Sequence, residues 1–306
     1  MRERLFLSIG EAMVEMSQAD GGLWRMGFAG DTLNTAWYAR ACLPPEWKVA
    51  YFTRLGTDPF SEHLLAFLDA NHIETAFVTR DAERTVGLYA IELDEGERSF
   101  SYWRSHSAAR RLADDEAALG AAIGVADVVY FSGITLAILA PDRRARLLQM
   151  VEQARAEGKL TVFDPNIRPR LWEDAETMRT WLSRAAKTAA IALPSFDDEA
   201  SVFGDADIEV CAARWLRLGA GEVAVKNGGG PIAVSQPDGT IRTMTLESVK
   251  PVDSTGAGDS FNGGYLAARL AGADPDEAAR RGHAVASRVV GHPGALMPRD
   301  ALCDTA

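Results

Sequence analysis

Cysteine is scarce in this chain: its 306 residues include only Cys42, Cys211 and Cys303, an odd number spread along the sequence. No CxxC pair and no histidine at ligand spacing accompanies them, which argues against a disulfide scaffold and a zinc site. Long apolar runs are also lacking, and the N-terminal stretch Leu5–Ile9 is too short for a signal peptide. We therefore expect a cytoplasmic protein that does not contact a membrane.

Basic residues are in deficit, with 32 Lys and Arg against 43 Asp and Glu, so the formal net charge is −11. Such a balance argues against a general binder of nucleic acid or of anionic membranes, because both need a basic surface. It leaves room for a small anionic ligand held by a few arginines. Hydrophobic residues make up 47% of the chain and charged residues 25%, which is typical of a globular protein with a large core.

Several known site motifs are missing. The sequence contains no GxGxxG, no GxxxxGK[ST], no HExxH and no HRD or DFG set. A dinucleotide fold of the Rossmann type, a P-loop, a zinc protease and a protein kinase are therefore disfavoured.

Short apolar runs alternate with helical patterns along most of the chain. The runs that predict strands are Leu5–Ile9, Val49–Thr53, Val128–Ser132, Leu160–Phe163, Ala189–Leu193 and Val223–Lys226. Helices are predicted after Asp58-Pro59 and over Pro141–Glu157, Ile208–Leu218, Gly258–Leu270 and Asp276–Val290. This alternation predicts a mainly parallel sheet covered by helices on both faces.

Two stretches depart from that pattern. Residues 13–28 contain the turn signal Asp20-Gly21-Gly22, and residues 85–104 contain Asp94-Glu95-Gly96-Glu97 between alternating segments. Both predict hairpins. We interpret them as a small β-sheet lid, and the alternative is that they are edge strands of the main sheet.

The segment Pro251–Phe261 carries the clearest chemical signal. Gly256, Ala257 and Gly258 directly precede an amphipathic helix, where outward-pointing N–H groups and the helix dipole favour a phosphoryl group. Asp259 would repel a phosphate, but it suits a base that takes a proton from a hydroxyl. The alternative interpretation is a tight turn with Asp259 as a helix-start residue.

Polar loops follow several predicted strands or open a helix. Gly30, Asp31 and Asn34 open a helix that could contact a polyol, although Asp31 could instead be an N-cap. Polar residues follow a predicted strand in three places: Asp164–Arg170, Ser195 with Asp198, and Lys226–Gly230. Ligands of open α/β sheets bind at such carboxyl ends, so one shared cleft is expected. The triple glycine 228–230 could equally be a hairpin turn.

Taken together, these motifs resemble the signatures of the ribokinase-like (PfkB-type) carbohydrate kinases. Asp253–Phe261 is similar to the C-terminal signature, and Gly30–Asn34 with Arg54–Phe60 to the N-terminal one. The resemblance runs along essentially the whole chain. It is strongest to members that act on 2-keto-3-deoxygluconate, on four stretches: 27–35, 96–104, 163–172 and 294–299.

The resemblance implies a single three-layer α/β/α domain over residues 1–306, with a lid from about 11–29 and 85–105. It implies transfer of the ATP γ-phosphoryl, assisted by Mg²⁺, to the C6 hydroxyl of 2-keto-3-deoxygluconate. The implied catalytic residues are Asp259 as base and Gly256, Ala257 and Gly258 as anion hole. The implied substrate contacts are Gly30, Asp31, Asn34, Tyr89, Tyr102, Arg104, Arg168 and Asp259. The implied nucleotide contacts are Asn166, Ser195, Lys226, Gly228, Gly230 and the anion-hole residues, with Asp198 holding Mg²⁺ through water.

Some positions depart from the family pattern. Ala29 stands where a second glycine is usual, and Ser195 and Asp198 stand where many members have Asn and Glu. A sugar acid needs local positive charge, which Arg104 and Arg168 can supply and a neutral sugar would not require. The alternatives are a kinase of fructose or ribose type and a catalytically silent sugar-binding relative.

Two further expectations concern Asp259 and assembly. An unperturbed Asp259 would be ionised at neutral pH and could accept the proton directly. Exposed lid strands that carry the aromatic residues Tyr89, Phe100 and Tyr102 predict self-pairing, and hence a homo-oligomer formed through the lid.

Overall fold

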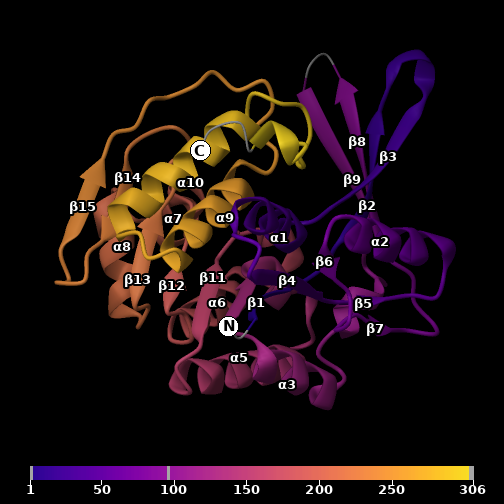
Figure 1. Cartoon of the computed structure of the whole chain (residues 1–306), viewed down its shortest axis with the longest axis horizontal. Coiled ribbons are helices and arrows are strands. Elements are labelled where there is room, and N and C mark those ends of the chain that lie inside the picture. The colour runs from indigo at the N-terminus through magenta and orange to yellow at the C-terminus, as the bar shows by residue number, and fades with distance from the viewer. Residues whose placement is uncertain (1–2, 95–96, 303–306) are drawn as a thin grey trace.

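The computed structural model describes residues 3–94 and 97–302, and its largest element is a nine-stranded sheet (Figure 1). The strand order is β15 (Ile241–Met244), β14 (Ile232–Ser235), β13 (Glu222–Val225), β12 (Ile191–Ala192), β11 (Leu160–Asp164), β10 (Val128–Ser132), β1 (Arg4–Ile9), β4 (Trp47–Phe52) and β6 (Ile73–Glu74). Neighbours from β13 to β6 are parallel, and β14 and β15 are antiparallel. The predicted mainly parallel sheet is confirmed, but its antiparallel edge was not predicted.

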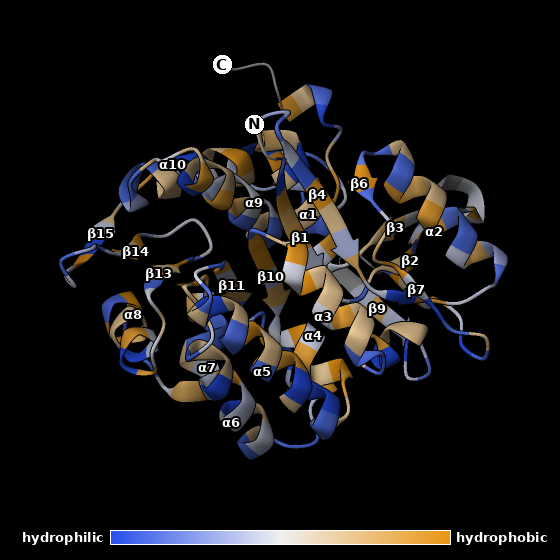
Figure 2. Ribbon diagram, turned by 60° about the horizontal axis from the view of Figure 1, so that its bottom comes forward, coloured by the Kyte–Doolittle hydropathy of each residue, from blue (hydrophilic) through white to orange (hydrophobic). Residues whose placement is uncertain are grey.

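Helices cover both faces of this sheet. They are α1 (Asp31–Cys42), α2 (Pro59–Ala70), α3 (Glu116–Val125), α4 (Gly133–Ile138), α5 (Pro141–Ala156), α6 (Ala175–Ala186), α7 (Phe196–Phe203), α8 (Ile208–Arg217), α9 (Ala257–Leu270) and α10 (Pro275–Val289). One buried core joins the sheet to α1, α2, α9 and α10, and another joins it to α3, α4, α5, α6 and α8. The central strands are mostly apolar, whereas the helices carry both apolar and polar residues (Figure 2). The predicted three-layer α/β/α fold is confirmed.

The two predicted hairpins form a separate four-stranded sheet that projects from the body of the molecule (Figure 1). Its order is β3 (Trp24–Ala29), β2 (Met13–Gln18), β8 (Gly87–Asp94) and β9 (Glu97–Trp103). The alternative that these strands extend the main sheet is therefore wrong. Glu95 and Gly96 of the predicted turn, and Cys303, lie outside the described residues. A third, two-stranded sheet pairs β5 (Arg54–Leu55) with β7 (Thr79–Arg80).

Aspartate side chains begin five of the helices. The N-caps of α2, α3, α6, α8 and α10 are Asp58, Asp115, Asp174, Asp207 and Asp274, and each carboxylate accepts from a backbone N–H of the first turn. Such a bond satisfies an amide that has no partner within the helix, and it stabilises by about 1 kcal/mol. The sequence prediction of a cap at Asp58 is confirmed.

Polar segments that are distant in the sequence meet at the carboxyl edge of the main sheet. Asp164 ends β11 in register with Ser132 at the end of β10. Ser195 and Lys226 form an isolated parallel bridge beyond β12 and β13. The predicted strand Ala189–Leu193 is only two residues long in the structure, and Pro194, which has no N–H for the ladder, follows it. No helix in the described part of the chain is long and apolar enough to cross a membrane.

Candidate active site

The turn before α9 exposes backbone N–H groups. Gly256 is left-handed (φ 76°), and a Cβ added there would lie 2.8 Å from the Ala295 carbonyl oxygen, so this turn requires glycine. Gly256 is the N-cap of α9 and makes no side-chain cap bond. Among the described residues, the amides of Gly256, Gly258 and Asp259 donate no turn hydrogen bond. The amide of Ala257 donates to the Ser254 carbonyl oxygen at 3.2 Å, so the prediction of Ala257 as a free donor of the anion hole is wrong for the ligand-free protein. The turn therefore offers free donors and the positive end of a helix dipole to an anion.

Asp259 lies in the first turn of α9, but it does not cap the helix. Its Oδ2 accepts from Asn34 Nδ2 at 2.8 Å, so α1 and α9 bring the two predicted residues together. Burial, together with the carboxylates of Asp31 and Asp164, raises the pKa of Asp259 to about 8, although the hydrogen bond from Asn34 and the Lys226 ammonium act in the opposite direction. Asp259 in the ligand-free protein is therefore not the unperturbed carboxyl that the sequence analysis considered. The sequence could not show that three carboxylates would converge.

Lys226 is a buried cation next to the turn. Its Nζ donates to Asp164 Oδ2 (2.9 Å) and Asn262 Oδ1 (3.1 Å), and only 7% of the residue is exposed. A Cβ added at Gly258 would lie 3.5 Å from Nζ, which places the ammonium beside the anion-binding turn. Asn262 Nδ2 also donates to Asp164 Oδ2 at 2.6 Å and to the Tyr130 hydroxyl at 3.1 Å. This network fixes one positive charge where an anion would arrive.

Asp164 and Asn262 were not among the predicted site residues. Asp164 is the first residue of the predicted polar stretch Asp164–Arg170, in which roles were predicted only for Asn166 and Arg168, and Asn262 follows Asp259 by three residues on the same helix. A spacing of three puts both side chains on one helix face, and this was the available signal.

The start of α1 holds the predicted sugar-side residues. Gly30 is its N-cap without a side-chain bond, which excludes the interpretation of Asp31 as the cap. A Cβ at Gly30 would lie 2.3 Å from the Glu11 carbonyl oxygen. Asp31 Oδ2 accepts from Asn166 Nδ2 at 2.9 Å, and burial raises the pKa of Asp31. Asn166, predicted as a nucleotide contact, thus lies against a predicted sugar contact.

A cleft of about 340 Å³ brings together most of the predicted nucleotide residues. Its lining includes the polar side chains of Ser195, Asp198 and Lys226, together with Gly228, Gly230, Ala257 and Gly258. Its apolar lining includes Ile232, Val249, Phe261 and Val290. An apolar wall facing a polar, glycine-rich end is the arrangement expected for a base at one end and phosphates at the other.

The predicted contacts from the small sheet are placed unequally. Tyr89 is buried and its hydroxyl donates to Glu15, which corrects the expectation that Tyr89 is an exposed aromatic of the sheet. Tyr102 is 53% exposed. Arg104 is buried and donates to Glu11 Oε2 through Nε (2.8 Å) and Nη2. The charge of Arg104 is thus already offset by a buried carboxylate.

Arg168 forms an ion pair with Asp198, which lines the 340 Å³ cleft. Arg168 Nη1 lies 3.3 Å from Asp198 Oδ2 and also donates to the Ile167 carbonyl oxygen at 2.7 Å. The side chains are 52% and 36% exposed. Burial raises the pKa of Asp198, and the Arg168 charge lowers it.

A larger cleft of about 780 Å³ lies between the small sheet and the segment 292–300. Ala29 and Thr255 are among its lining residues, and Trp37 and Phe67 contribute aromatic surface to it. Asp259 and the glycines of the turn do not line it. Size alone therefore does not identify the reactive site.

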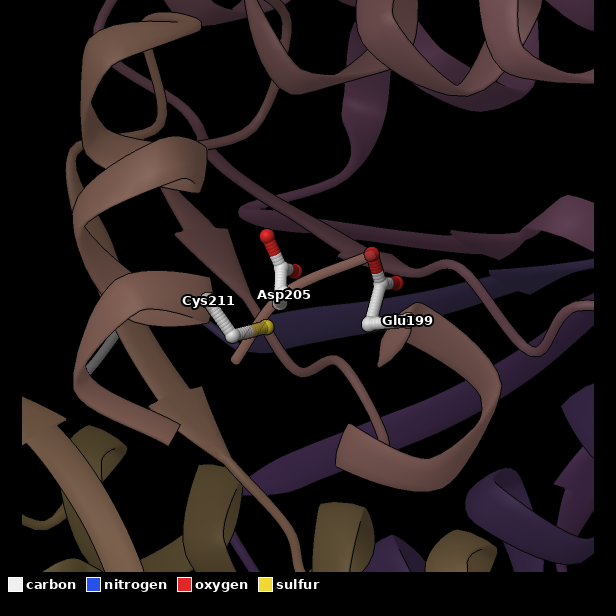
Figure 3. Close-up of side chains that lie close together, drawn as sticks. All are labelled: Glu199, Asp205 and Cys211. Carbon is white, nitrogen blue, oxygen red and sulfur yellow. The ribbon is translucent and has the colours of Figure 1, made fainter. Parts of the chain in front are cut away.

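Glu199, Asp205 and Cys211 form a second cluster (Figure 3), with their potential ligand atoms within 4.8 Å of one another. Arg214 lies among them: Nη2 donates to Asp205 Oδ2 at 2.6 Å and also to Glu199. The guanidinium already supplies the positive charge that a metal ion would bring. We therefore describe the cluster as a buried ion-pair network that joins α7 to α8.

Comparisons with known proteins agree over nearly the whole chain. A family model described as pfkB family carbohydrate kinase matches residues 4–301. The chain is 40% identical over 301 residues to the 2-dehydro-3-deoxygluconokinase of Escherichia coli (strain K12). The alignment covers 96% of this chain and 97% of that protein.

Solved structures are also similar to this chain over nearly its whole length. A PfkB protein from Polaromonas sp. JS666 superposes with a TM-score of 0.82 at 28% identity, covering 99% of both chains. A fructokinase with bound ATP from Xylella fastidiosa has a TM-score of 0.77 at 23% identity and covers 98% of this chain and 95% of that one. At that identity the second likeness concerns the fold alone.

Proposed function

This chain belongs to the pfkB family of carbohydrate kinases, and we propose that it transfers the ATP γ-phosphoryl to the C6 hydroxyl of 2-keto-3-deoxygluconate, giving 2-keto-3-deoxy-6-phosphogluconate. This sugar acid is also called 2-dehydro-3-deoxygluconate, the substrate named for the Escherichia coli relative. The observation that carries the proposal is the position of Asp259, which lies between the turn at Gly256–Gly258 and Asn34 on the sugar side.

Asp259 acts as the base in this proposal. Its carboxylate accepts the hydroxyl proton as the hydroxyl oxygen attacks the γ-phosphorus and the bond from that phosphorus to ADP breaks, so that ADP leaves. Asn34 donates to Oδ2 of this carboxylate through its amide. The amides of Gly258 and Asp259, with the Lys226 ammonium, stabilise negative charge on the transferred group. Phosphoryl transfer depends mainly on such alignment and charge stabilisation.

The nucleotide binds in the 340 Å³ cleft, with Ser195, Lys226, Gly228 and Gly230 around its phosphates. Asp198 offers the hard oxygen ligand that Mg²⁺ prefers, and it lines the same cleft. When bound, Mg²⁺ offsets phosphate charge. Asp198 would hold it through water.

The substrate is tested by a panel. An assay of ADP release should give the highest kcat/KM with 2-keto-3-deoxygluconate, compared with its galactose-derived epimer, fructose and ribose. The physical reason is that a carboxylate can pair with an arginine, and a neutral sugar leaves that charge unused. Preference for fructose or ribose would replace the sugar-acid proposal with the neutral-sugar alternative. No turnover with any of these sugars would favour a silent binding protein.

The pH dependence follows from the raised pKa of Asp259, because only the ionised carboxylate accepts a proton. Below about pH 8 the ligand-free carboxyl is largely protonated, so kcat/KM for the sugar acid should rise with pH and level off above that value. Asp31→Asn removes a neighbouring like charge and should move this rise to lower pH, whereas the ionisation of ATP itself would not move. A flat profile from pH 6 to 9 would contradict the assignment.

We further propose that the chain is a single domain, residues 1–306, and that the small sheet, within about 11–29 and 85–105, closes over the sugar and pairs with a second copy. Its outer strands β3 and β9 expose large apolar side chains: Leu23, beside β3, and Trp24, Met26, Phe100, Tyr102 and Trp103. A patch of this kind is typical of a protein interface.

This assembly predicts a dimer or larger oligomer whose mass falls to that of a monomer in Trp103→Glu, measured by light scattering. Phe60→Glu, an exposed aromatic on α2 and outside the small sheet, is the matched control and should leave the mass unchanged. A monomeric wild-type protein at micromolar concentration would contradict assembly through the sheet.

A further inference from the structure

The ion pair between Arg168 and Asp198 connects the two halves of the proposed site. Arg168 lies in the loop after β11, two residues beyond Asn166, the partner of Asp31. Asp198 lies in the first turn of α7 and lines the nucleotide cleft. Each residue is assigned to a different ligand, yet without ligands they hold each other at 3.3 Å.

This pair is weak enough to exchange its partners. Both side chains are partly exposed, and only Nη1 of Arg168 reaches the carboxylate. Ion pairs of this kind favour the paired state of the two side chains over the unpaired state by at most about 5-fold. The other predicted carboxylate contact, Arg104, makes two bonds to the buried Glu11 and is much harder to release.

We propose that Arg168 exchanges Asp198 for the carboxylate of the sugar acid, that Asp198 is thereby freed for the magnesium–nucleotide complex, and that each ligand consequently strengthens binding of the other. This inference rests on the function proposed above. It makes Asp198 a competitor of the sugar acid in the absence of nucleotide, in addition to its role toward the metal.

The expected coupling follows from linkage. Each ligand alone must break the ion pair, but when both bind the pair is broken only once. The gain in affinity for the second ligand therefore equals the preference for the pair, up to about 5-fold. The gain should shrink at high salt, because exposed charges are screened.

Calorimetry tests the exchange directly. 2-Keto-3-deoxygluconate is titrated into the protein with and without MgCl₂ and a non-hydrolysable ATP analogue. Wild type should bind the acid up to about 5-fold more tightly with the analogue present. Asp198→Asn should bind it more tightly than wild type in the absence of nucleotide, and the analogue should then add nothing. A mere positioning role for Asp198 predicts the opposite, namely weaker binding.

Asp197→Asn is the matched control, because it removes an equal charge one position before Asp198. The Asp197 side chain is exposed and has no bond to Arg168 in the described structure. It should retain the coupling. Weaker or unchanged binding of the acid by Asp198→Asn, or equal tightening by both variants, would overturn the exchange. If wild type binds the acid no better than fructose, the proposed function fails instead.

Discussion

Asp259→Asn should lower kcat by roughly 100-fold or more while ATP binds within about threefold of wild type. Asparagine preserves the shape of the side chain and can still bond with Asn34, but its amide cannot take the proton from the sugar hydroxyl. The nucleotide contacts come from other residues, so binding should persist. Steady-state turnover and calorimetric titration of a non-hydrolysable ATP analogue, measured on the same preparation, separate the two effects.

Asp142→Asn is a matched control for this variant. Asp142 also lies in the first turn of a helix, α5, but on the opposite helical layer and exposed to solvent. Its replacement should leave turnover unchanged. Turnover of Asp259→Asn within a few-fold of wild type would remove Asp259 from the role of base.

Lys226→Met should damage both stability and activity. Removing the ammonium leaves the buried carboxylate of Asp164 without its cation, which typically costs about 3–5 kcal/mol in the free energy of unfolding. Activity should fall by roughly 100-fold, because the positive charge beside the turn at Gly258 is lost. Chemical denaturation and steady-state kinetics measure these two quantities separately.

The double variant Lys226→Met with Asp164→Asn distinguishes a catalytic from a structural role. Neutralising Asp164 removes the unpaired buried charge, so most of the lost stability should return. Activity should stay low, since the lysine charge beside the turn at Gly258 is still missing. Recovery of activity together with stability would mean that Lys226 serves only to neutralise Asp164.

The sequence predicts the parts of this site that depend on local chemistry. These parts are the glycines before α9, the aspartate that follows them and the polar loops after parallel strands. They can be predicted because backbone conformation and strand order constrain where they lie. The bond between Asn34 and Asp259 confirms that helices α1 and α9 meet at that point.

The remaining features depend on which side chains meet after folding. Three of these contacts join residues that are distant in the sequence. Arg104 pairs with Glu11, Tyr89 bonds to Glu15, and Asp31 and Asp164 lie close to Asp259. No single-chain pattern specifies such partners, so the burial of Tyr89 and the raised pKa of Asp259 could not be predicted. The hairpin β14–β15 was missed, although the turn signal Pro237-Asp238-Gly239 separates its two strands.

A crystal structure with 2-keto-3-deoxygluconate and a non-hydrolysable ATP analogue bound together is the most direct measurement. We expect the C6 oxygen within about 3 Å of the Asp259 carboxylate and in line with the γ-phosphorus, whose oxygens contact the amides of Gly258 and Asp259. A C6 hydroxyl directed away from Asp259, or a γ-phosphate remote from this turn, would contradict the proposed chemistry.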